Sequence, residues 1–158
     1  MNRIDWNGKP CMTDARYRTF DFWIGEWSVN SFQNGAPQGS NDVVGMLDGC
    51  VIMEHWVPHA NNRNRGRSVN YLNPNTGKWH QLYFTDQGGA IECVGEFRDG
   101  AMRFEREYTQ SGRRIAERMS FTPEPSGDVR QYWEISADGG TNWNPLFDGR
   151  YIKKRRPQ

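Results

Sequence analysis

Polar and aromatic side chains recur at a spacing of two residues in four short segments of the chain. They are Glu54 and Trp56 in VIMEHWV, Ser68 and Asn70 in SVNYL, Trp79, Gln81 and Tyr83 in WHQLYF, and Gln131 and Trp133 in VRQYWEI. Residues two apart in a β-strand point to the same face of the sheet. If these faces point inward, they enclose a cavity with aromatic walls and a few polar groups, which is the composition of a small-molecule site.

Glu54 is the candidate for acid–base chemistry in this set. Burial among tryptophans would raise the pKa of its carboxyl group, and Tyr83, His55 or Arg118 would then serve as proton donor or anion stabiliser. Arg118, together with Ser120 in RIAERMS, would also give Glu54 a buried counter-charge. Such a site suits isomerisation, cyclisation or elimination on an aromatic or terpenoid-like substrate, and it needs no cofactor.

The sequence alone does not determine which face of each strand points into the barrel. A one-residue slip in WHQLYF would instead turn His80, Leu82 and Phe84 inward. Inward polar residues can also simply satisfy one another or bound water, and a Glu–Arg pair can lie on the surface across two strands. The same pattern therefore has a purely structural interpretation beside the functional one.

EHWVPH contains three residues of metal-binding types, Glu54, His55 and His59. Pro58 excludes the helical presentation that paired histidines of HExxH sites require, so we predict a strand that ends in a loop and no metal site. Haem binding through His55, His59 or His80 is an alternative, although no histidine follows His80. The next segment, NNRNRGR, is expected to form a basic loop over the mouth of the fold.

Turn-forming residues punctuate the chain at short intervals, in segments such as NPNTGK, TDQGG and PEPSGD. Between them lie ten segments rich in aromatic and β-branched residues: WSVNSF, VVGML, VIMEHWV, SVNYL, WHQLYF, IECVGEF, MRFEREY, RIAERMSF, VRQYWEI and FDGRYI. This pattern predicts an all-β fold, an antiparallel up-and-down β-barrel of about ten strands that closes by pairing its two edges. In TDARYRTFDFW, Thr13 or Asp14 can cap a short helix that plugs one end with Tyr17, Phe20 and Trp23.

Length and composition limit the architecture and the partners. The 158 residues predict one domain over 1–158, with an N-terminal arm at 1–12 and a basic tail at 155–158. Only 35% of the residues are hydrophobic, but seven tryptophans can build a core or the walls of a cavity. The net charge of +1 gives no field that favours nucleic acid or an anionic membrane. The sequence does not determine the oligomeric state, and a homodimer is one alternative.

The expected location is cytoplasmic. The sequence has no apolar run long enough to span a bilayer, and MNRIDWNGKP lacks the hydrophobic region of a signal peptide. Cys11, Cys50 and Cys93 form no CxxC pair, so we expect incidental thiols in a reducing compartment.

A series of motifs resembles a known family. Gly25-Glu26-Trp27 matches the Gly-x-Trp that opens the first strand of lipocalins and related calycin barrels. In order, FDFWIGEW, GCVIMEHW, SVNYLNPNTGKWHQLYFTDQGG, VRQYWEISADGGTNW and FDGRYIKK resemble a lipocalin-like (calycin-type) family of small, mostly uncharacterised bacterial β-barrel proteins. The resemblance implies a barrel that holds a small, largely apolar molecule. It also implies that Trp27 packs at the closed end against Arg150 or Lys153.

SADGGTNW, residues 136–143, resembles the Asp-box motif of sialidase propellers through Ser136, Asp138, Gly140 and Trp143. A single copy in a chain of this length cannot build a propeller. We therefore predict a structural hairpin connection with no part in sugar cleavage.

Three functions fit these observations. The first is binding of a small hydrophobic or aromatic molecule in the barrel cavity. The second is a cofactor-free isomerase, cyclase or lyase that uses the acid–base residues of the same cavity. The two differ in whether Glu54 is buried beside a second titratable group. The third, a protein-interaction module, would require a contiguous exposed apolar patch.

Overall fold

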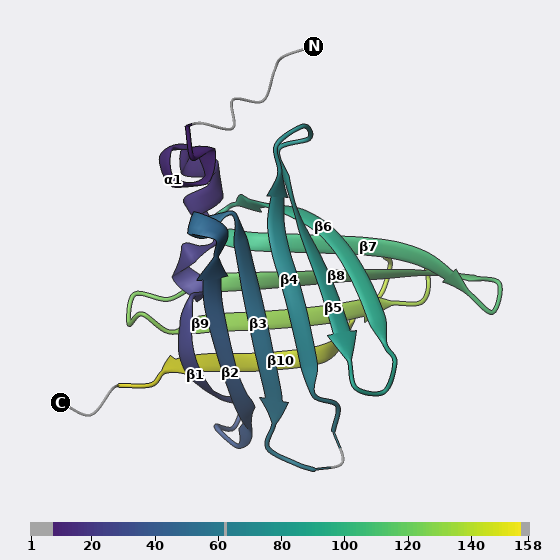
Figure 1. The fold of residues 1–158 in the computed structure, drawn as a ribbon. Helices are drawn as coiled ribbons and strands as arrows, with labels where there is room; N and C mark the ends of the chain where they lie inside the picture. The colour runs from purple at the N-terminus through teal and green to yellow at the C-terminus, as the bar shows by residue number, and fades with distance from the viewer. Residues whose placement is uncertain (1–7, 62, 156–158) are drawn as a thin grey trace.

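The computed structural model describes residues 8–61 and 63–155 and shows a closed antiparallel barrel (Figure 1). Its strands are β1 Gly25–Ser31, β2 Pro37–Met46, β3 Val51–Pro58, β4 Gly66–Asn73, β5 Lys78–Thr85, β6 Ala90–Arg98, β7 Ala101–Gln110, β8 Arg113–Pro123, β9 Val129–Ser136 and β10 Asn144–Lys153. Each strand pairs with the next along the chain, and β1 pairs with β10 to close the ring. The predicted up-and-down barrel is confirmed, and all ten predicted segments form strands.

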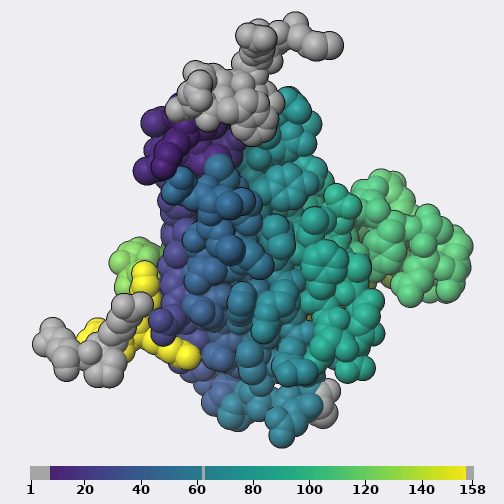
Figure 2. Space-filling model, viewed as in Figure 1, coloured from purple at the N-terminus to yellow at the C-terminus, as the bar shows by residue number. Residues whose placement is uncertain are grey.

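Tight turns connect β6, β7 and β8. Asp99-Gly100 joins β6 to β7 and Ser111-Gly112 joins β7 to β8, and all four residues have positive φ. Two-residue turns of this kind match the right-handed twist of paired strands. The β7–β8 hairpin extends well beyond the rest of the barrel, as the green projection in Figures 1 and 2 shows.

The N-terminal segment plugs one end of the barrel, as predicted. It forms α1 (Pro10–Thr13) and two 3₁₀ turns, η1 (Ala15–Arg18) and η2 (Asp21–Trp23), in place of one continuous helix. Asp14 caps η1 by accepting a hydrogen bond from the backbone N–H of Arg16. α1 begins inside the predicted arm at 1–12; residues 1–7 of that arm and 156–158 of the tail lie outside the described residues.

The plug is held by aromatic packing. Phe20 and Trp23 are completely buried and stacked, with ring centroids 5.0 Å apart. Phe20 also contacts the rings of Trp79, Phe104 and Phe121 from three barrel strands. Aromatic pairs at these separations add to the free energy gained from burial. The closed end of the barrel is therefore a solid core.

Trp27 lies at this closed end, and Lys153 is its basic partner. The Lys153 ammonium group is 5.5 Å from the centre of the Trp27 ring, and the two residues face each other across β1 and β10. Arg150, the other candidate, instead pairs with Glu124 on the outer surface. The packing implied by the resemblance is thus found, with Lys153 in the basic position.

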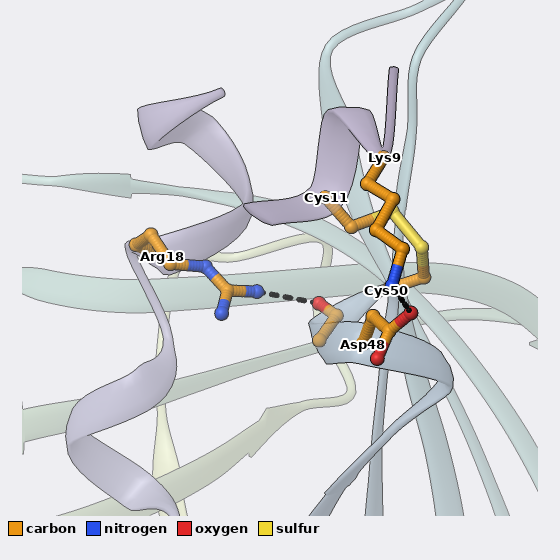
Figure 3. Close-up of a disulfide and its surroundings, with 6 residues drawn as sticks. Lys9, Cys11, Arg18, Asp48 and Cys50 are labelled. Carbon is orange, nitrogen blue, oxygen red and sulfur yellow. Dashed lines mark hydrogen bonds and ion pairs between the residues drawn. A yellow bond between two sulfur atoms is a disulfide. The ribbon is translucent and has the colours of Figure 1, made fainter. Parts of the chain in front are cut away.

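A disulfide joins Cys11 to Cys50 (Figure 3). The expectation of three incidental thiols is wrong for this pair, and Cys93 remains a free, buried thiol. The two partners are 39 residues apart and meet only because α1 folds back over η3 (Leu47–Gly49), the turn that precedes β3. Two further contacts hold the same segments together: Lys9 with Asp48, and Arg18 with the carbonyl oxygen of Gly49.

The segment SADGGTNW connects β9 to β10 as a structural turn, as predicted. Ser136 Oγ accepts from the N–H of Gly140, and Asp138 Oδ1 accepts from the N–H groups of Thr141 and Asn142. These hydrogen bonds hold the pKa of Asp138 near 2. The side chains of Ser136, Asp138 and Trp143 thus all form hydrogen bonds within the turn.

In the part of the chain that the structure describes, no helix is both long and apolar enough to cross a bilayer.

Candidate functional site

A cavity of about 840 Å³ occupies the end of the barrel opposite the plug. Its apolar walls come from five strands and include Trp56, Ile91, Met119, Trp133, Leu146 and Phe147. Polar lining groups include Glu54, Gln81, Tyr83, Gln131 and Tyr151. A volume of this size is within the range of small-molecule sites in proteins.

The segment between β3 and β4 lies at the mouth of the cavity, at the bottom of Figure 1, as expected of the basic loop NNRNRGR. His59, Ala60, Arg63 and Asn64 contribute to the lining there. The mouth therefore carries a cationic side chain and an imidazole, whereas the deeper walls are aromatic.

Most residues of the predicted inward faces do meet in the cavity. Those that line it are Glu54, Trp56, Gln81, Tyr83, Gln131 and Trp133. Two glycines make room for the large ones. A Cβ atom at Gly66 would lie 2.0 Å from the Tyr83 hydroxyl oxygen, and one at Gly39 would lie 2.6 Å from the Trp56 ring. Both aromatic side chains thus lie flat across a neighbouring strand.

Three inward residues lie away from the cavity surface. Ser68 and Asn70 are fully buried behind it. Trp79 is on the predicted face but near the closed end, where it packs against Phe20 and donates from Nε1 to Thr19 Oγ1. The prediction that Asn70 and Trp79 contact the ligand directly is therefore corrected: one supports the cavity lining and the other belongs to the core.

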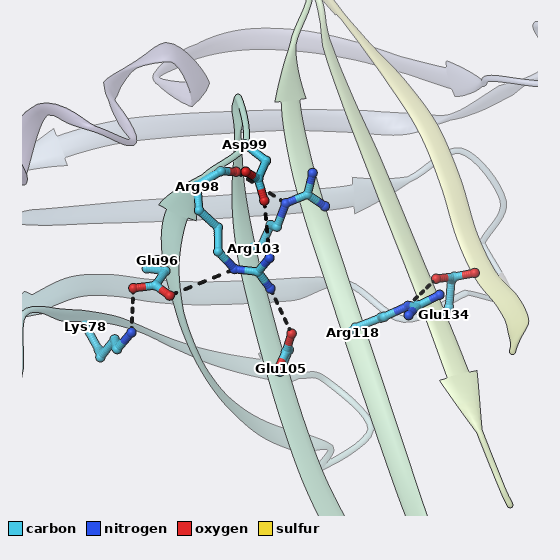
Figure 4. Close-up of polar contacts among 8 residues, drawn as sticks. All are labelled: Lys78, Glu96, Arg98, Asp99, Arg103, Glu105, Arg118 and Glu134. Atoms are coloured by element: carbon cyan, nitrogen blue, oxygen red, sulfur yellow. Dashed lines mark hydrogen bonds and ion pairs between the residues drawn. The ribbon is translucent and has the colours of Figure 1, made fainter. Parts of the chain in front are cut away.

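Arg118 and His55 lie on the outer face of the barrel. Arg118 donates to Glu134 Oε2 at 2.6 Å (Figure 4) and lies over the Trp143 ring at 3.9 Å. His55 faces Asp42 and Arg67 across the neighbouring strands, between the inward residues Glu54 and Trp56. The predicted Arg118 counter-charge for Glu54 is wrong, because β8 turns Glu117 and Met119 inward instead of Arg118 and Ser120.

Glu54 is the centre of a buried hydrogen-bond network at the floor of the cavity. Its Oε1 accepts from Asn41 Nδ2 at 2.7 Å, and its Oε2 accepts from Ser68 Oγ at 2.6 Å. Both carboxyl oxygens therefore have neutral donors. Such groups satisfy a buried carboxyl group without forming an ion pair.

The network extends from Glu54 to two glutamines. On one side, Asn70 Nδ2 donates to Ser68 Oγ, and Asn70 Oδ1 accepts from Gln81 Nε2 at 2.7 Å. On the other side, the Tyr151 hydroxyl accepts from Asn41 Nδ2 and donates to Gln131 Oε1 at 2.6 Å. Gln81 and Gln131 are thus each held by a hydrogen bond from or to a residue of this network.

Burial dominates the titration behaviour of this site. It raises the pKa of Glu54, against the opposing effects of the hydrogen bonds from Ser68 and Asn41 and of the charge on Arg67. Burial and the nearby Glu54 also raise the pKa of Tyr151 and Tyr83. The two phenols therefore remain neutral hydrogen-bonding groups around a carboxyl group whose pKa burial raises.

A second buried polar cluster lies behind Trp133, and sequence reasoning missed it. Glu117 Oε1 accepts from Arg106 Nη2 at 2.6 Å and from the Tyr108 hydroxyl at 2.8 Å, while Oε2 accepts from Trp133 Nε1 at 2.9 Å. Glu117 is only 4% exposed. The alternation of Glu117 with Met119 and Phe121 in RIAERMSF was the signal that could have revealed it.

His80 Nδ1 lies 3.9 Å from Glu92 Oε1, and a single carboxylate beside one histidine does not make a metal site. His55 and His80 point outward, His80 stacking on Tyr71 at 5.1 Å, and His59 is at the mouth. Within residues 8–61 and 63–155, no three His, Cys, Asp or Glu side chains are grouped as a metal site would require.

Comparison with protein-family models and with curated proteins finds no match to this chain. The closed antiparallel ten-stranded barrel is consistent with a lipocalin-like fold.

Proposed function

We propose that this protein binds a small hydrophobic or aromatic molecule in the barrel cavity. The observation that carries the proposal is the cavity of about 840 Å³ whose aromatic walls, Trp56, Trp133 and Phe147, stand over a floor of mutually hydrogen-bonded polar groups. The walls offer apolar area to a ligand. At the floor, both oxygens of the buried Glu54 carboxyl group accept hydrogen bonds from neutral donors, so this group needs no charge from the ligand.

Native mass spectrometry of the purified protein, followed by denaturing extraction, tests this proposal. A bound mass that is released on denaturation and is a small apolar or aromatic compound would support it. If no such mass appears and aromatic compounds added at millimolar concentration also fail to bind, the proposal is contradicted.

Acid–base catalysis in the same cavity is a second candidate function. It is favoured by Glu54, which lines the cavity and has a raised pKa, beside the titratable Tyr83 and Tyr151. A cofactor-free isomerase, cyclase or lyase would use Glu54 as the general base. In that case Glu54→Gln abolishes turnover of the extracted compound and leaves its binding almost intact. Full turnover in the variant would remove Glu54 from the mechanism.

Membership of the lipocalin-like (calycin-type) bacterial family is part of this proposal, supported by the barrel and by Trp27 against Lys153. The absence of nucleic-acid and membrane partners stays a prediction from the balanced charge, and a homodimer stays open. The cytoplasmic location also stays a prediction. The Cys11–Cys50 disulfide argues against it, because disulfides persist mainly in oxidising compartments.

A further inference from the structure

The orientation of the Asn70 amide is fixed by the backbone. Asn70 Nδ2 lies 3.1 Å from the carbonyl oxygen of Ile52, which can only accept a hydrogen bond. The nitrogen of this amide must therefore be on that side, and its oxygen must be on the other. Asn70 is fully buried, so water cannot take either role from the outside.

The orientation of the Gln81 amide group is determined by that of Asn70. Because Asn70 presents Oδ1 to Gln81, the group that meets it must be the donor Nε2, at 2.7 Å. The carbonyl oxygen of Gln81 is then turned away from Asn70, on a residue that lines the cavity. This Oε1 accepts no hydrogen bond from the described residues. The β5 wall of the cavity thus presents an acceptor.

Gln131 presents the opposite polarity on β9. Tyr151 accepts from Asn41 and uses its own proton for Gln131 Oε1. The amide nitrogen of Gln131 is left with the sulfur of Met119 at 2.9 Å, which is a weak acceptor. Strands β6, β7 and β8 separate β5 from β9, so this donor faces the cavity from a different wall.

We infer that the cavity selects an uncharged aromatic molecule with a hydrogen-bond donor for Gln81 Oε1 and, apart from it, an acceptor for Gln131 Nε2. A hydroxyaryl ketone has this arrangement. A carboxylate beside Gln81 and Glu54 would meet acceptor oxygens without a cation, so aryl carboxylates are excluded from the floor. The inference rests on the proposed function, because it specifies the ligand of the same cavity.

Four compounds with one ring system test the inference. 2-Ethylnaphthalene carries neither polar group, 2-naphthol carries the donor, 2-acetylnaphthalene carries the acceptor, and 6-acetyl-2-naphthol carries both. Binding is measured for each by quenching of tryptophan fluorescence in the full chain. We expect the hydroxyl and the acetyl group each to increase affinity about threefold to tenfold, the range of a net hydrogen bond.

The variants Gln81→Leu and Gln131→Leu serve as controls for each other. Gln81→Leu should remove the gain from the hydroxyl group and keep the gain from the acetyl group, and Gln131→Leu should do the reverse. Both Gln81→Leu and a second variant, Gln81→Met, leave Asn70 Oδ1 without its donor, and methionine is included because its unbranched side chain is closer in shape to glutamine. Saturable binding of 2-ethylnaphthalene shows that each variant retains the folded cavity, and the gains from the polar groups are measured relative to this compound in the same variant.

The outcomes separate the inference from the proposed function. If 2-ethylnaphthalene binds but the polar groups give no gain, or if the hydroxyl gain survives in both Gln81 variants, the inference is overturned and the proposed function stands. If none of the four compounds binds to the unmodified protein, the proposed function fails and the inference fails with it.

Discussion

Ser68 Oγ donates a 2.6 Å hydrogen bond to Glu54 Oε2, and this contact links a carboxyl group on β3 to the serine directly opposite on β4. Both side chains are buried. The pair shows how the floor of the cavity is built: a group that would be costly to bury alone is satisfied by neutral donors from the adjoining strands.

Glu54 makes the stability of the protein depend on pH. The carboxyl group ionises near 4.5 in the unfolded chain and only at higher pH in the fold, where burial raises its pKa. Between these two values the folded state holds more protons, so the free energy of unfolding falls as the pH rises. The Glu54→Gln variant has no ionisable group at this position, so its free energy of unfolding does not fall in this way. Its melting temperature relative to the unmodified protein should therefore increase as the pH is raised from 4.5.

Glu96→Gln is the matched control for this titration. Glu96 is exposed, and its hydrogen bond with Lys78 lowers its pKa (Figure 4), so its contribution is lost as the pH falls. The melting-temperature difference for Glu96→Gln should therefore change mainly below pH 4.5 and stay nearly constant above it, whereas the difference for Glu54→Gln changes as the pH rises above 4.5. A melting-temperature difference for Glu54→Gln that stays constant from pH 4.5 to 9 would contradict the buried, raised pKa of Glu54.

Glu117 should be more important for stability than its neighbours on the β7–β8 hairpin. Glu117→Leu leaves the Arg106 guanidinium and the Trp133 indole N–H without their acceptor. We expect a loss of about 3 kcal/mol in the free energy of unfolding, measured with urea, as for other broken buried pairs. Glu107→Leu breaks an exposed pair with Arg114 and should cost about 0–1 kcal/mol. Equal losses would show that Glu117 is not a buried anchor.

The sequence predicted the faces of strands better than positions along them. Alternation placed Glu54, Gln81 and Gln131 inward correctly, because each shares its face of the strand with a large aromatic residue two positions away. It could not show that Trp79 lies at the closed end, since alternation carries no information about height along the barrel axis. The prediction that Arg118 points inward was wrong because β8 has charged residues on both faces, with Glu117 inside and Arg118 outside.

The Cys11–Cys50 pairing was beyond sequence reasoning for a different reason. It depends on how the plug folds back over η3, a contact between segments with no shared pattern. The plug itself was predicted from the cap at Asp14 and the apolar Tyr17, Phe20 and Trp23, which are all buried, although the segment forms two 3₁₀ turns and not one helix. Local sequence patterns thus predicted the strands and the plug, whereas the pairing of Cys11 with Cys50 depends on tertiary contacts.

Gly66 should be intolerant of a side chain. Gly66→Ala places a Cβ atom 2.0 Å from the Tyr83 hydroxyl oxygen, so Tyr83 must move and reshape the cavity. We expect a loss of about 1–3 kcal/mol in the free energy of unfolding and weaker binding of 2-naphthol. Gly45→Ala on β2, whose Cβ would meet only Ile24 at 3.4 Å, is the control. Gly66→Ala with unchanged stability and binding would mean that Tyr83 does not lie across Gly66.

The disulfide should stabilise the protein by constraining its unfolded chain. Closing a loop between residues 39 apart predicts a contribution of up to about 4 kcal/mol, which Cys11→Ser would remove. Denaturation with and without dithiothreitol measures it: reductant should destabilise the unmodified protein and leave Cys11→Ser unchanged. Cys93→Ala, which alters only the free thiol, should respond to reductant like the unmodified protein. Insensitivity of the unmodified protein would contradict a structural disulfide.

The most direct test of ligand binding in the cavity uses the tryptophan indole N–H signals in a ¹H–¹⁵N NMR titration with 2-ethylnaphthalene. Trp56 and Trp133 line the cavity, whereas Trp23 and Trp27 are buried at the closed end and serve as internal controls. We predict saturable shifts of the Trp56 and Trp133 signals with the Trp23 and Trp27 signals almost unmoved. No shifts, or shifts of equal size at all four indoles, would contradict a small-molecule site in this barrel.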